Sequence, residues 1–299
     1  MKISKSRGGV MACLVVAAAF ASSTTTAQLA VAGRGISGGG EQEAEIVPLT
    51  SEQAASRVLR LAEVDALIQS QNGGGITPEG VCEGGEPPPC QGSVPSSYSL
   101  STHARHQYRW FYCGVAVVQV VSNFTWNYAS TSTCGENCAA GINKYKQSTI
   151  SSSWTKTDAY GYTPLSTLIT GMNAASVKPS GFAYVPWTGP TWVQFHNAII
   201  DDTWTWRMPL AAGVNPRLAG SAYYLYSWRN VGGGDYGHYI ALRGYSGNFQ
   251  SSAYAYYNDS SGGKDELTGE TILGSTGAFS DLSYTVYKTM MNRYGNLVW

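Results

Sequence analysis

The spacing of hydrophobic and polar positions predicts two kinds of element in residues 97–299. Apolar residues at helical spacing, with a start signal at Thr163 before Pro164, predict helices at residues 161–176, 191–202 and 280–295. Tyrosine-rich runs, the last two alternating along their length, predict strands at residues 221–228, 238–245 and 251–259. Because helices and strands do not alternate as βαβ units, the order favours an α+β domain.

The hydrophobic pattern does not distinguish a helix from a strand in one apolar segment. The segment GVAVVQVV, residues 114–121, is rich in valine, which favours a strand. It is also almost continuously apolar, which suits either a core strand or a buried helix. The hydrophobic pattern therefore leaves both structures open for this segment.

The first 32 residues have the pattern of a signal peptide. Lys2, Lys5 and Arg7 precede an apolar run at residues 10–21, which is too short to span a bilayer and suits a signal sequence. We therefore predict a signal peptide within residues 1–32, with a secreted protein and no membrane span once that peptide is removed.

Residues 33–96 are predicted to be a pro-segment or linker with one helix. Thr50 and Gln53 form a capping box, and glycines at residues 73–75 end the helix. Its predicted apolar stripe consists of Val58, Leu61, Leu67 and Ile68. The stretch that follows is dense in Pro, Gly and Ser, as in linkers. We expect this helix to cover a cleft of the domain at residues 97–299 until it is removed.

Composition argues against several classes of partner and cofactor. Charged residues make up 13% of the chain and balance to zero, which gives no electrostatic basis for binding nucleic acid or anionic lipid. The glycines before Asp235 lack the lysine and helix of a phosphate loop. Cys134 and Cys138 have too few ligands nearby for zinc. We therefore predict no cofactor and no metal.

The cysteine count singles out one thiol. Of six cysteines, Cys13 leaves with the signal peptide, and export makes disulfides possible for the others. Proximity in the chain favours the pairs Cys82–Cys90 and Cys134–Cys138. Cys113 remains unpaired, as a candidate nucleophile or a buried thiol.

A nucleophilic thiolate needs an imidazole and a group that orients it. Of the four histidines, His238 stands out because it opens a predicted strand after a glycine-rich loop. If the strands at 238–245 and 251–259 form an antiparallel hairpin with a bulge, His238 and Asp259 become neighbours across it. Asn258 and Asp235 are rival partners for the imidazole.

An oxyanion needs hydrogen-bond donors as well. Gln107, six residues before Cys113, carries a side-chain amide that can donate beside the backbone N–H of the cysteine.

In the order Gln107, YCG at 112–114, GHYIALRGY at 237–245 and YYNDS at 256–260, the chain resembles the papain-like cysteine peptidases. It most resembles the branch of bacteriocin-processing (double-glycine leader) peptidases and their secreted relatives. The resemblance implies an α+β fold whose central helix bears Cys113 and packs on an antiparallel sheet that bears His238. It also implies a helix for residues 114–121.

The resemblance further implies a role for each site residue. Cys113 would be the nucleophile, His238 the base, Asp259 the orienting residue and Gln107 the oxyanion donor. Two positions depart from the family pattern, because Val115 and Ser260 stand where the family has proline.

We thus expect a secreted cysteine peptidase or amidase that acts on a peptide or protein substrate through a thiol acyl-enzyme. The alternatives are a thiol acyltransferase with the same triad and a non-catalytic, disulfide-stapled binding module. The preference of the relatives also predicts self-cleavage near Gly74–Gly75.

Overall fold

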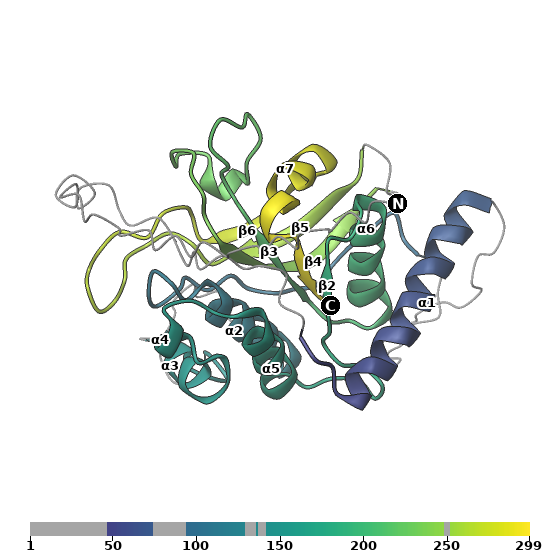
Figure 1. Cartoon of the computed structure of the whole chain (residues 1–299), viewed down its shortest axis with the longest axis horizontal. Helices are drawn as coiled ribbons and strands as arrows, with labels where there is room; N and C mark the ends of the chain where they lie inside the picture. Colours follow the sequence, from purple (N-terminus) through teal and green to yellow (C-terminus); the bar gives the residue numbers. More distant parts are fainter. Residues whose placement is uncertain (1–46, 74–93, 129–135, 137–141, 248–251) are drawn as a thin grey trace, which may run out of the picture. The chain divides into compact units, whose positions relative to one another are not determined.

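An antiparallel sheet forms the centre of the structure, a computed structural model (Figure 1). It describes residues 47–73, 94–128, 136, 142–247 and 252–299, which belong to the unit formed by residues 33–299. The strands lie in the order β2-β7-β3-β4-β5-β6, and β1 also pairs with β4. Their bounds are β1 Ser97–Ser99, β2 Pro186–Thr188, β3 Leu210–Val214, β4 His238–Ser246, β5 Tyr254–Asp259, β6 Gly277–Ser283 and β7 Asn296–Val298.

Helices pack against this sheet from several parts of the chain. The α-helices are α1 Ser51–Gly73, α2 Cys113–Thr125, α3 Gln147–Ile150, α4 Thr157–Tyr160, α5 Leu165–Ala175, α6 Trp192–Ile200 and α7 Tyr284–Tyr294. Three short helices of other types are η1 Ser151–Thr155, η2 Asp201–Thr205 and η3 Tyr226–Trp228. Figure 1 shows α2 and α5 beside each other, with α6 next to α1.

The valine-rich run is a helix in the structure. It belongs to α2, which packs against β4 and α5 and is buried from Cys113 to Asn123. Burying a valine side chain contributes about 1.5 kcal/mol or more. Valine's cost in helix propensity is at most about 0.7 kcal/mol. Tertiary burial therefore outweighs the local preference for a strand.

The predicted fold class is confirmed. A central helix that begins at Cys113 packs on an antiparallel sheet whose strand β4 begins at His238. This is the predicted α+β arrangement.

Most predicted elements of the domain are present, with three corrections. The helix predicted at 161–176 begins at Leu165, directly after Pro164. Residues 221–228 are not a strand: their end forms η3, a turn of 3-10 helix. In this segment Leu225 and Trp228 are buried, whereas Tyr223 and Tyr226 are exposed. The predicted helix at 280–295 begins four residues late, because its first residues extend strand β6.

The predicted helix before the domain is also present, and its contact face agrees with the prediction in part. Leu61, Leu67 and Ile68 of the predicted stripe pack against the core. The capping box forms, because Thr50 N–H donates to Gln53 Oε1 at 2.8 Å and Gln53 N–H donates to Thr50 Oγ1 at 3.2 Å. Val58, which was placed in the apolar stripe, is 71% exposed. Arg60 is instead completely buried. A charged side chain therefore anchors α1.

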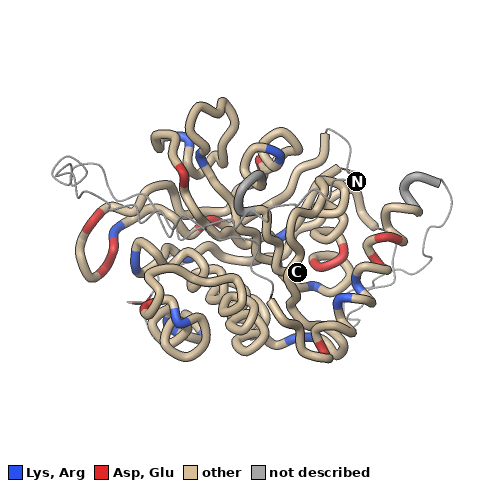
Figure 2. The backbone as a smooth tube through the Cα atoms, in the orientation of Figure 1, with Lys and Arg blue, Asp and Glu red and all other residues tan. Residues whose placement is uncertain are grey.

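Several predictions concern residues that lie outside the described ranges. These are the signal peptide at residues 1–32, the cleavage site at 74–75 and the disulfides of Cys82, Cys90, Cys134 and Cys138. Within the described ranges, none of the helices combines the length and the apolar character that a membrane crossing requires. Figure 2 shows acidic and basic residues interspersed along the drawn chain.

Candidate active site

Cys113 is the first residue of α2 and a free, buried thiol that is 6% exposed. The first N–H groups of a helix have no acceptor within the helix. The residue before the helix, Tyr112, supplies no side-chain cap. The thiol therefore lies at the positive end of the α2 dipole, next to backbone donors that can bind a negative charge.

Gly114 sets how closely this helix start approaches its neighbour. A Cβ atom added to Gly114 would lie 2.6 Å from Cβ of Thr163, too close for any side chain without a shift. Thr163 is held by a 2.8 Å hydrogen bond with Thr157. The glycine after the cysteine is therefore required by packing, and it fixes where the thiol stands.

The structure brings His238 and Asp259 together. His238 Nε2 lies 2.8 Å from Asp259 Oδ1, and both side chains are fully buried. Ala241 pairs with Asn258 across β4 and β5, so the register continues with Ile240 opposite Asp259, and His238 lies two residues further on the same face. The contact is thus diagonal across the ladder, and a bulge between Leu242 and Gly244 adjusts the hairpin.

Asp259 accepts three further hydrogen bonds. Its Oδ2 accepts from Ser227 Oγ at 2.6 Å and Trp228 Nε1 at 3.2 Å, while Oδ1 also accepts from Ser261 N at 2.8 Å. Burial by itself raises the pKa of Asp259, but the charge of His238 and these hydrogen bonds hold it below its ordinary value. Asp259 is therefore ionised and fixed in orientation at neutral pH.

Sequence reasoning missed Ser227 and Trp228, because residues 221–228 were predicted to form a strand. Trp228 also lies beside the imidazole, with its ring 5.5 Å from that of His238. These two residues of η3 hold the carboxylate against His238. An aromatic residue with a polar N–H next to a serine is too common a pattern to have indicated this role.

The charge on His238 is stabilised from two sides. Burial lowers its pKa, but the charge and hydrogen bond of Asp259, together with those of Cys113, raise it to about 10. Nε2 is occupied by Asp259, whereas Nδ1 makes no hydrogen bond of regular geometry to a described residue. Cys113 is thus close enough to His238 to contribute to the raised pKa of the imidazole. The raised pKa favours the imidazolium form of His238.

Gln107 is buried beside the loop that leads into α2. Its backbone N–H donates to Ser260 O at 2.9 Å, which ties this loop to the residue after Asp259. Its side-chain Nε2 donates to the carbonyls of Arg109 at 3.1 Å and Trp110 at 2.6 Å. Gln107 thus lies near the site, with its amide hydrogens directed at backbone oxygens.

The rival partners of the imidazole point elsewhere. Asn258 is on the opposite face of β5 and accepts a hydrogen bond from Thr102. Asp235 is exposed, and its Oδ1 lies 3.5 Å from Asn215 Nδ2.

The remaining histidines are also apart from this pair. His196 is buried against the rings of Trp192 and Tyr245, and burial lowers its pKa to about 4. His106 interacts with Glu266 at 3.1 Å, and His103 is half-buried in the same loop. Among the described residues, no group of three or more His, Cys, Asp or Glu could hold a metal ion.

Comparison with known proteins gives no match in sequence, and the solved structures described below match with low TM-scores. Neither a protein-family model nor a curated protein matches the chain. Among solved structures, the Amb a 11 cysteine protease of ragweed pollen, in its proform, is 11% identical over 67% of this chain and 71% of that chain, with a TM-score of 0.29.

Two further structures score similarly. The cysteine protease and lectin-like domains of a surface layer associated protein of Clostridium difficile are 15% identical over 85% of this chain and 60% of that chain, with a TM-score of 0.28. Recombinant stem bromelain precursor is 14% identical over 85% of this chain and 93% of that chain, with a TM-score of 0.27. At TM-scores this low, the matches carry no weight for the function.

Proposed function

We propose that the protein is a thiol hydrolase that cleaves peptide or amide bonds through an acyl-enzyme on Cys113. The observation that carries this proposal is the buried His238–Asp259 pair, whose imidazole interacts with a free thiol at the start of a helix. The proposed reaction needs a thiolate, a group that carries protons and a fixed orientation for that group, and Cys113, His238 and Asp259 supply them in that order.

In the first half of the reaction, the Cys113 thiolate attacks the carbonyl carbon of the scissile bond. The backbone N–H of Cys113 donates to the oxyanion that forms. The C–N bond then breaks, His238 gives its proton to the leaving amine, and a thioester remains on Cys113.

In the second half, water attacks the thioester while neutral His238 takes one of its protons. The C–S bond breaks, the carboxylic acid leaves, and the thiolate faces a protonated His238 again. Asp259 keeps the imidazole in one orientation and stabilises its positive charge throughout.

Gln107 is proposed as the second oxyanion donor, after one of its amide hydrogens leaves a backbone carbonyl. Gln107→Ala is expected to lower kcat/KM for hydrolysis by about 100-fold, the usual effect of losing one such donor. Alkylation of Cys113 by iodoacetamide forms no oxyanion, so its rate is expected to change by less than about threefold. Equal losses in both assays would mean that Gln107 only supports the loop, and the donor role would be dropped.

The function is tested by incubating the protein with a peptide library of natural sequences and detecting the products by mass spectrometry. Cleaved peptides are expected with the wild type and none with Cys113→Ala. Cleavage by both proteins, or by neither, would contradict the proposal, and the second result would favour the binding module. Stable amides formed with an added amine donor would indicate acyl transfer instead of hydrolysis.

The same library also tests the finer assignment. We propose that the protein belongs to the branch that resembles the double-glycine leader peptidases and that it is secreted. We also propose that its signal peptide within residues 1–32 is removed and that the chain is cut near Gly74–Gly75 on maturation. Cleavage after paired glycines would support this branch, and a different preference at the cleavage site would contradict it.

A further inference from the structure

Helix α1 is attached to the rest of the protein through a buried polar face. Ser56, Arg60 and Val64 follow one another at intervals of four residues and are all buried, whereas Val58 faces outward. The contact face of α1 is therefore centred on a fully buried arginine, which needs compensating partners.

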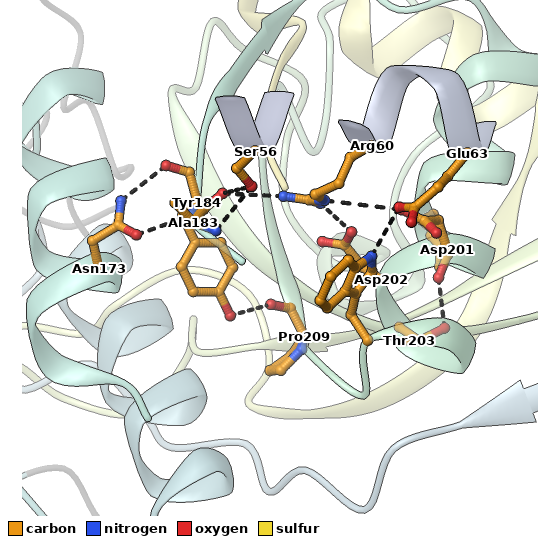
Figure 3. A network of polar contacts seen from close by, with 12 residues as sticks. Ser56, Arg60, Glu63, Asn173, Ala183, Tyr184, Asp201, Asp202, Thr203 and Pro209 are labelled. Atoms are coloured by element: carbon orange, nitrogen blue, oxygen red, sulfur yellow. Dashed lines mark hydrogen bonds and ion pairs between the residues drawn. The ribbon is translucent and has the colours of Figure 1, made fainter. Parts of the chain in front are cut away.

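The partners of Arg60 come from distant parts of the chain (Figure 3). Its guanidinium is stacked between the rings of Phe182 and Trp299, 4.3 Å from each centroid. Nη1 donates to the carbonyl of Ala183 at 3.2 Å, and Nη2 forms an ion pair with Asp202. We call the surrounding residues the Arg60 pocket: Phe182, Ala183, Asp201, Asp202 and Trp299.

The pocket is complementary to a cation. Asp201 and Asp202 are both fully buried at the start of η2, and Arg60 Nε lies 3.9 Å from Asp201 Oδ2. Burial raises the pKa of Asp202 to about 7, against the lowering effect of Arg60. Burial and the charge of Asp202 raise the pKa of Asp201 well above its ordinary value. Asp202 is therefore the carboxyl that pairs directly with the guanidinium of Arg60, while burial beside Asp202 favours the protonated form of Asp201.

Other α1 side chains form hydrogen bonds with polar groups of the domain at residues 97–299, which we call the body. Ser56 Oγ accepts from Ala183 N at 3.0 Å and donates to Ala183 O at 3.3 Å (Figure 3). Glu63 Oε2 accepts from Trp206 Nε1 at 3.0 Å. Without α1, the buried backbone of Ala183 would lose these bonds and the Asp202 carboxylate would lose its cation.

The position of α1 is also informative. It packs mainly against α6 and η2, and Figure 1 shows it separated from α2, the helix that begins at Cys113. Helix α1 thus packs on the side of the body formed by α6 and η2, whereas it was expected to cover the cleft.

We propose that the Arg60 pocket is a binding site for an arginine-bearing helix, and that its occupant is α1 of the same chain. Helix α1 then stays bound, without a covalent link, when the chain is cut between residues 74 and 81, before the predicted Cys82–Cys90 disulfide. The mature protein accordingly consists of two noncovalently associated pieces whenever maturation cuts there. This inference does not depend on the proposed hydrolase activity.

The test uses the full chain with a recognition sequence for a specific protease inserted between residues 74 and 81, so that no predicted disulfide links the two pieces. After cleavage, size-exclusion chromatography is expected to show the α1 fragment eluting with the body. A fluorescent synthetic peptide of residues 47–73 is then exchanged into the cut protein, and unlabelled peptides compete with it. Because the substitutions are only in the peptide, they cannot impair folding of the body.

Competition by Arg60→Gln is expected to be about 100-fold weaker than by the unchanged peptide, as for the loss of a central buried arginine. The Arg60→Lys peptide is expected to compete more weakly than the unchanged peptide and more strongly than the Arg60→Gln peptide, because lysine keeps the charge but has no planar guanidinium to stack between the two rings. The control Arg57→Gln changes a half-buried arginine on the same helix and is expected to compete within about threefold.

Two results would overturn the proposal. One is an α1 fragment that separates from a body whose tryptophan fluorescence shows that it is still folded. The other is equal competition by the Arg60→Gln and Arg57→Gln peptides, which would mean that the pocket does not recognise the guanidinium.

Discussion

His238→Ala is expected to lower kcat/KM for amide hydrolysis by about 10⁴-fold, because it removes both the counter-ion of the thiolate and the proton carrier. The same substitution is expected to slow alkylation of Cys113 by iodoacetamide about 100-fold at pH 6. Alkylation needs the thiolate but no proton transfer to a leaving amine, so it isolates the charge effect of His238 from its role as an acid.

The pH dependence of alkylation follows from the direction of the His238 shift. Its pKa is raised from 6.5 to about 10 in the folded protein. In the folded protein the imidazolium, and with it the favourable charge interaction, therefore persists well above pH 6.5 and is lost as the pH rises through 10. Between pH 6 and pH 9, the wild-type rate is expected to change by less than about threefold, whereas the His238→Ala rate rises with each unit of pH.

A matched control is His106→Ala, which changes a partly exposed histidine that interacts with Glu266. Its alkylation rate is expected to equal that of the wild type. If His238→Ala and the wild type shared one pH profile, Cys113 would be an ordinary buried thiol and the hydrolase proposal would fall.

The arrangement of the site was predictable where it depended on a short-range pairing. The alternating strands around residues 246–253 predicted a hairpin, and the hairpin places His238 beside Asp259. The diagonal register was not predictable, because it depends on a bulge at Leu242–Gly244 that no local residue preference specifies.

The structure of α2 could not be decided from its own residues. Five valines favour a strand locally, and the helix forms because it is surrounded by α5 and the sheet. Here only the family resemblance pointed to the observed helix. At residues 221–228 the aromatic content suggested a strand that does not form. The chain turns there instead, and Ser227 and Trp228 donate hydrogen bonds to Asp259.

Arg60 shows why long-range polar contacts escape a reading of the sequence. On its own, an arginine in a charged helix indicates a solvent-exposed face. Its carboxylate partner Asp202 lies 142 residues further along the chain. Asp201 and Asp202 are the last two residues of the helix predicted at 191–202. Neither half of the contact therefore indicated the other.

The second large effect is expected at Asp259. Asp259→Ala is expected to lower kcat/KM by about 10³-fold, since the imidazole loses its orientation and its main source of charge stabilisation. Asp259 is the largest of the influences that raise the pKa of His238. Without it, that pKa falls, so the alkaline limb of the pH–rate profile is expected to move toward neutral pH.

Asp259→Asn separates orientation from charge. Asparagine retains an oxygen that can accept from His238 Nε2, but it removes the negative charge. The decrease in kcat/KM is therefore expected to be about tenfold smaller for Asp259→Asn than for Asp259→Ala. The alkaline limb is nevertheless expected to move in both variants, because it reports the charge. Asn258→Ala is the control, since Asn258 bonds to Thr102 on the opposite face, and less than about threefold change is expected.

Folding has to be measured alongside activity. Removing one member of a buried ion pair costs about 3–5 kcal/mol, so Asp259→Ala is expected to lower the free energy of unfolding by that order. Activity is therefore compared at a temperature at which circular dichroism shows every variant to be folded. An alkaline limb that does not move in folded Asp259→Ala, or an equal loss in Asn258→Ala, would show that Asp259 does not orient the imidazole.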